Sequence, residues 1–165
     1  MKYLALLIFF ILTHTVYSLV DLGSWSLLEP FLIMLILVYY IFENPWIYYP
    51  LALGAGLLVD GFSASFGLHT FSFLLVLFSL STLQLTIFTS KNTGTIIFLT
   101  WLGCIIFWLS LWLLYYLSHW SIYILSWPTI WQIIKMIFID TGIIVFVYIL
   151  YFNLWLKKHH EKRSF

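Results

Sequence analysis

The chain has 165 residues, of which 64% are hydrophobic, 22% aromatic and only 8% charged, and its formal net charge is +1. A soluble globular domain carries about a quarter charged residues, so this chain has too few polar side chains to cover a water-soluble particle. The nearly balanced charge also gives no basic surface for nucleic acid. These values indicate an integral membrane protein without a nucleic-acid partner.

The hydrophobic runs between polar breaks predict the fold class. A bilayer core about 30 Å thick needs roughly 20 apolar residues for each spanning helix. We therefore predict an all-α, polytopic membrane bundle of six transmembrane helices that forms a single domain, residues 1–165. The expected spans cover residues 3–20, 28–43, 46–62, 67–89, 95–117 and 130–156, and a basic tail follows at 157–165.

The first of these spans also has features of a secretory signal. Its stretch "MKYLALLIFFILTHTVYS" begins with a basic residue and continues with an apolar run. The position where cleavage would be expected lacks the usual alanines, so we expect the segment to be retained as a span.

The basic residues predict the orientation, because cytoplasmic loops are enriched in Lys and Arg. With six spans, Lys2, Lys91 and the tail that contains Lys157 and Arg163 all fall on one side of the membrane. We therefore expect both termini to be cytoplasmic.

Small and polar residues gather at the end of the third span, in "GLLVDGFSASFGLHT", residues 56–70. Ala52, Gly56 and Asp60 are spaced four apart and share one helix face, where small residues let another helix approach closely. We expect Asp60 to accept hydrogen bonds in the turn that follows, with His69 facing it; a direct role of Asp60 in transport or binding is the alternative. The same turn contributes Ser63, Ser65 and Gly67.

The sixth span holds two charged residues, Lys135 and Asp140. Five positions turn them about 140° apart on a helix, so they do not face each other well. Lys135 is near the outer end and can extend its amine towards water. Asp140 lies deeper and must point into the bundle or towards a partner, as a possible intramembrane polar contact.

Catalytic and metal-binding patterns are missing from the sequence. There is no G-x-S-x-G, H-E-x-x-H or phosphate-loop motif, and Cys104 is the only cysteine. A metal site would need three or four ligands, whereas Asp60 with His69 supplies two. Asp60 and Asp140 lie at different depths, which disfavours an aspartyl intramembrane protease. We expect no enzyme activity, no metal and no cofactor.

The order of "EPFLIMLILVYYIF", "PLALGAGLLVDGFSASFGLHTFSFLLVLF" and a last span with a basic tail resembles the MreD family of bacterial rod-shape-determining proteins. The motif that carries the resemblance is G-x-x-x-D-x-x-S-x-S-x-G, formed here by Gly56, Asp60, Ser63, Ser65 and Gly67, and followed by Leu68 and His69. It departs from many members at Phe31, where they carry Asp or Asn after the proline.

The resemblance implies a non-enzymatic component of the cell-elongation machinery, which directs peptidoglycan synthesis, in the bacterial inner membrane. Its implied partner is MreC; MreB, a SEDS-type glycan polymerase and a penicillin-binding transpeptidase belong to the same assembly, and membrane lipid surrounds it.

The family is also similar in fold to the substrate-binding subunits of energy-coupling-factor transporters. The alternative function is therefore a small-molecule-binding membrane subunit of a transporter. Such subunits use a run of alanines on their first helix for docking, and the first span here offers only Ala5.

Overall fold

A computed structural model describes residues 29–42, 44–63, 67–86, 92–118 and 127–151 of the chain. These residues form helices and no strand. The helices, in chain order, are α2 (Pro30–Phe42), α3 (Pro45–Ser63), α4 (Leu68–Thr86), α5 (Thr93–Leu117) and α6 (Trp127–Tyr151). The first predicted span, Ser65, Lys91 and the basic tail lie outside the described residues. The described part confirms the all-α fold class.

The described part of the chain does not support the prediction of six spans. Among the described helices, α4, α5 and α6 are long and apolar enough to cross a membrane. With 13 residues, α2 is about 20 Å long and falls short of the roughly 30 Å bilayer core. The 19 residues of α3 include two prolines, an aspartate and several glycines, and this polar and helix-breaking content lowers its hydropathy. The runs predicted for these two helices, 28–43 and 46–62, were already shorter than the roughly 20 residues that a spanning helix needs.

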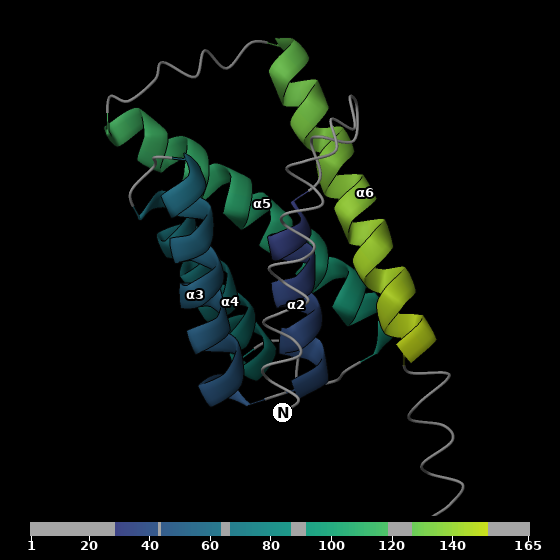
Figure 1. Ribbon diagram of the computed structural model, residues 1–165. Coiled ribbons are helices and arrows are strands. Elements are labelled where there is room, and N and C mark those ends of the chain that lie inside the picture. The colour runs from purple at the N-terminus through teal and green to yellow at the C-terminus, as the bar shows by residue number, and fades with distance from the viewer. Residues whose placement is uncertain (1–28, 43, 64–66, 87–91, 119–126, 152–165) are drawn as a thin grey trace, which may run out of the picture.

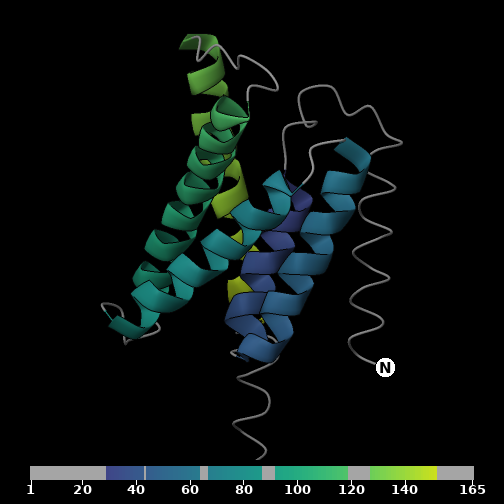
Figure 2. The ribbon, with the colours of Figure 1, turned by 90° about the vertical axis from the view of Figure 1, so that its left-hand side faces the viewer.

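The helix α2 lies at the centre of the described bundle, where it contacts α3, α4 and α6 (Figures 1 and 2). Its residues are buried on nearly every side between Phe31 and Tyr40, as expected for a helix that is apolar all round. Around it, α3 packs on α4, α4 on α5, and α5 on α6. The core is therefore built around a short helix.

Polar and aromatic contacts fix α5 against its neighbours. The Thr100 hydroxyl donates to the Tyr40 hydroxyl at 3.2 Å, and Tyr40 in turn donates to the Ile96 carbonyl at 3.4 Å. The rings of Phe73 on α4 and Phe107 on α5 stack with centroids 5.2 Å apart. These contacts tie α5 to both α2 and α4.

A side-chain cap defines where α5 begins. Asn92 has an extended backbone, and its Oδ1 accepts hydrogen bonds from the Thr95 amide at 2.7 Å and the Thr95 hydroxyl at 2.6 Å. The cap satisfies a backbone N–H that the helix itself leaves without a partner.

We predict that Asn92→Ala lowers the free energy of unfolding by about 1 kcal/mol, because the first turn of α5 loses this acceptor. Thermal unfolding of the purified protein in detergent measures the change. Asn92→Asp keeps a side-chain acceptor and should retain most of the stability. An unfolding midpoint of the alanine variant equal to that of the unchanged protein would contradict the role of the cap.

Candidate functional site

The backbones of α3 and α4 touch at Gly56. A Cβ atom at this position would lie 2.3 Å from the Cα of Thr70 and 2.8 Å from its amide nitrogen. Real Cβ atoms do not approach other atoms so closely, so only glycine fits. Ala52 lies one turn earlier on α3 and is completely buried. The two small residues thus line the face of α3 that crosses α4.

The carboxylate of Asp60 caps the first turn of α4. Its Oδ1 accepts a hydrogen bond from the His69 amide at 2.9 Å, and its Oδ2 accepts from the Thr70 amide at 3.0 Å and from the Thr70 hydroxyl at 2.7 Å. These amides belong to the turn whose N–H groups have no partner within the helix. A negative charge at this end of a helix is also favourable. Asp60 therefore joins the end of α3 to the start of α4.

The imidazole of His69 lies against the same carboxylate. Its Nδ1 is 2.9 Å from Asp60 Oδ1, so with an ionised Asp60 the proton sits on Nδ1 and is donated to this oxygen. Both side chains are buried, His69 to 9% and Asp60 to 5% exposure, which strengthens their interaction. The structure thus brings Gly56, Asp60 and His69 together.

The turn before α4 depends on Gly67. Its φ of +83° lies in the left-handed region, which residues with a Cβ rarely adopt. The Gly67 carbonyl accepts from the Phe71 amide at 3.0 Å, so the chain enters α4 directly after it. Ser63 has a different role from Asp60, because its hydroxyl donates to the Val59 carbonyl of its own helix at 2.8 Å.

Thr70 is the site residue that the sequence analysis missed. It contributes both a backbone and a side-chain hydrogen bond to Asp60, and its Cα is the atom that Gly56 approaches. The available signal was the start of α4: once that start is placed at Leu68, His69 and Thr70 become the residues with free amides.

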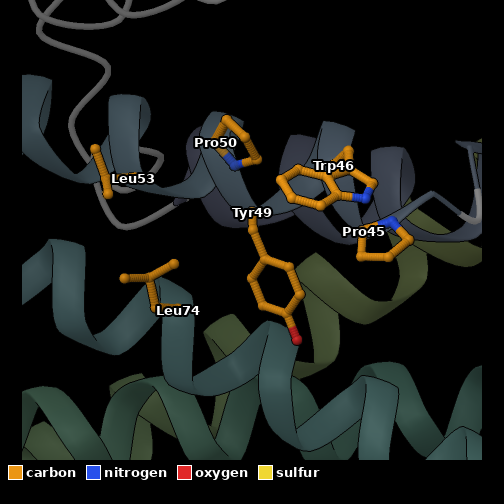
Figure 3. A pocket seen from close by; sticks show the side chains of 6 residues that line it. All are labelled: Pro45, Trp46, Tyr49, Pro50, Leu53 and Leu74. Atoms are coloured by element: carbon orange, nitrogen blue, oxygen red, sulfur yellow. The ribbon is translucent and has the colours of Figure 1, made fainter.

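Two hollows, which share one lining residue, lie along the crossing of α3 and α4. One hollow, of about 570 Å³, is apolar and is lined by Pro45, Trp46, Tyr49, Pro50, Leu53 and Leu74. In Figure 3, Tyr49 extends from α3 towards α4, and Leu53 and Leu74 lie on opposite sides of the hollow. A second hollow, of about 350 Å³, is lined by Leu57, Asp60, Gly61, Gly67, Thr70, Phe71 and also Leu74. We call the two hollows together the α3–α4 groove.

The two charged residues of α6 lie apart from this crossing. Lys135 is exposed, and its Nζ lies 5.6 Å from the centroid of the Trp131 ring. Asp140 is completely buried. The structure therefore does not pair them with each other. Among the described residues, no three His, Cys, Asp or Glu side chains are grouped as a metal site, and Cys104 is buried as a free thiol.

No protein-family model, curated protein or solved structure matches this chain. The function is therefore inferred from the geometry of the α3–α4 crossing and from the sequence motif that forms it.

Proposed function

We propose that the chain is a multi-pass, non-enzymatic scaffold of the bacterial cell-elongation machinery, held in the inner membrane with both termini in the cytoplasm. The observation that carries this proposal is that Asp60 joins the end of α3 to the start of α4. Its two oxygens accept hydrogen bonds from the α4 backbone and from Thr70, and one also meets His69. The most conspicuous acid of the sequence motif therefore holds two helices together, which is what a rigid docking platform requires.

The α3–α4 groove supports a helix as the docked partner. Its two hollows share Leu74 and follow α3 from Pro45 to Gly61, a rise of about 24 Å that covers most of a bilayer core. Large apolar side chains stand exposed along it, including Trp46 and Leu57. We propose that a membrane-spanning helix of MreC, the partner that the resemblance implies, occupies this groove.

Filling the groove should displace that partner. We predict that Leu53→Trp lowers the amount of MreC that co-purifies from native membranes by about tenfold or more, because the larger ring occupies the hollow into which the partner's side chains would pack. Quantitative pull-down of the tagged chain measures the ratio of the two proteins.

Leu109→Trp is the matched control, since Leu109 is an exposed leucine of α5 that does not line the groove. This variant should retain MreC at the level of the unchanged chain. Full retention of MreC by Leu53→Trp would exclude the groove as the docking surface, and failure of the unchanged chain to retain MreC would exclude the scaffold proposal.

One observation favours the alternative, a small-molecule-binding subunit of a transporter. The apolar hollow of about 570 Å³ falls within the volume range of small-molecule sites, roughly 300 to 1,000 Å³. Mass spectrometry of the protein purified from native membranes distinguishes the two functions: a stoichiometric small solute supports the transporter subunit, whereas co-purified MreC supports the scaffold.

A further inference from the structure

The face of α3 that lines the α3–α4 groove carries a regular row of exposed apolar residues. The row consists of Trp46, Pro50, Leu53 and Leu57, each of which lines one of the two hollows. These residues follow one another at intervals of four, three and four positions, which is the spacing of the seam along which two helices pack in a left-handed coiled coil. Helix pairs in membranes mostly pack with the same hand. The row therefore fits a second helix that lies along α3.

Pro50 interrupts the hydrogen-bond ladder of α3 within this row. Proline has no N–H, so the carbonyl of Trp46, four residues earlier, lacks the donor that closes a regular helical turn. Residues four apart share one face of a helix, and Trp46 and Pro50 both line the apolar hollow (Figure 3). The Trp46 carbonyl therefore lies on the groove side of α3.

The described neighbours do not replace the missing donor. In the described part of the chain, no side chain and no N–H of a turn or cap bonds to the Trp46 carbonyl. The α4 side of the hollow is formed by Leu74, which is a hydrocarbon, and the Tyr49 hydroxyl is engaged with Ser81. A helix docked in the groove covers the carbonyl and excludes water from it, and a buried acceptor without a donor is costly. The docked helix must therefore bring a donor of its own.

We propose that the helix which docks in the α3–α4 groove carries a Ser or Thr hydroxyl level with Pro50 and donates it to the Trp46 carbonyl. Carbonyls freed by proline in membrane helices are satisfied by neighbouring helices and by Ser and Thr side chains, and these small residues also let two helices pack closely. The inference rests on the proposed function and specifies how the partner is chosen: an entirely apolar helix leaves the carbonyl without a donor and is disfavoured.

Pro50→Ala tests the acceptor. Alanine restores the N–H, so the Trp46 carbonyl is satisfied within α3 and the partner's hydroxyl loses its acceptor. Retention of MreC by the tagged full-length chain, measured by quantitative pull-down from native membranes, should fall about fivefold, the equivalent of one hydrogen bond. The unfolding midpoint of this variant should not fall, because a proline inside a helix is unfavourable. A loss of MreC at unchanged or higher stability therefore reports the contact and not misfolding.

Pro45→Ala is the matched control. Pro45 lines the same hollow but is the first residue of α3, where an N–H has no acceptor within the helix. The substitution removes a proline ring without satisfying a carbonyl, and MreC retention should stay within about twofold of the unchanged chain. An equal loss in both variants, or no loss in Pro50→Ala, would overturn the proposal.

The carbonyl itself can be observed, because Trp46 and Ile47 form the single Trp–Ile pair in the sequence. Labelling Trp with ¹³C at the carbonyl and Ile with ¹⁵N at the amide therefore gives one NMR signal from this peptide bond. In the complex with MreC the ¹³C signal should lie downfield, as for a carbonyl that accepts a hydrogen bond, and replacing one Ser or Thr of the MreC spanning helix by Ala should move it upfield. If no such replacement moves the signal, the hydroxyl contact is excluded while the scaffold proposal stands. If the unchanged chain does not retain MreC, both proposals fall.

Discussion

Gly56→Leu is expected to be the most disruptive single substitution in the described part of the chain. Its Cβ would overlap the Cα of Thr70, 2.3 Å away, and backbone cannot move aside as a flexible side chain does. Overpacking of this kind costs about 3 kcal/mol or more, which corresponds to a fall of roughly 10 °C in the unfolding midpoint of a chain of this size. Thermal unfolding in detergent gives the midpoint.

The chain offers a matched control two residues away on the same helix. A Cβ at Gly54 meets nothing within 4 Å, so Gly54→Leu should change stability by no more than about 1 kcal/mol, and the better helix propensity of leucine favours a gain. Gly56→Ala adds only the Cβ and should fall between the two leucine variants. If both leucine variants melt at the same temperature, the close approach of α3 and α4 is not needed for stability.

The second large effect is expected from Asp60→Ala. The substitution removes the acceptor of two amides and one hydroxyl at the start of α4, and also the partner of the His69 ring. Buried donors left without an acceptor are costly, and we expect a loss of about 3 kcal/mol. Hydrogen exchange of the His69 and Thr70 amides should rise with the loss of thermal stability, because both measurements report the same turn.

Two further variants separate the cap from a transport role. Asp60→Asn keeps one acceptor oxygen and should lose less stability than the alanine variant. Ser63→Ala removes an exposed hydroxyl at the same end of α3 and should stay within about 0.5 kcal/mol of the unchanged protein. An Asp60→Ala variant that keeps its stability but loses binding of a solute would favour the direct role that the sequence left open.

The α3–α4 crossing was accessible from the sequence because its parts are local. The four-residue spacing of Ala52, Gly56 and Asp60 fixes their common face, and His69 follows only nine residues after Asp60. Because a glycine turn and the start of a new helix follow Asp60 closely, the free amides of that helix's first turn are the expected partners of its oxygens. The predicted fourth span begins within one residue of α4; Thr70 was missed because the hydrogen bonds expected for Asp60 were not assigned to the free amides of the first turn of that helix.

The interior of the bundle was much harder to predict. The sequence indicated that Asp140 points into the bundle or towards a partner, but the titratable groups within electrostatic range of this acid, Glu29 and Cys104, come from distant segments. The predicted run 28–43 agrees with the bounds of α2 to within two residues, but it was counted as a full span although it is shorter than the roughly 20 residues that a spanning helix needs. Hydropathy also does not report that other helices surround a short apolar helix.

The central place of α2 has a consequence for biosynthesis. This helix is made before α3, α4, α5 and α6, all of which it contacts in the described part of the protein. At about 20 Å, it is shorter than the hydrocarbon core of a bilayer. The described helices that surround it are complete only when α6, the last of them, has been synthesised. A nascent chain that stops before residue 127 therefore lacks the helix that covers one side of α2 in the finished protein.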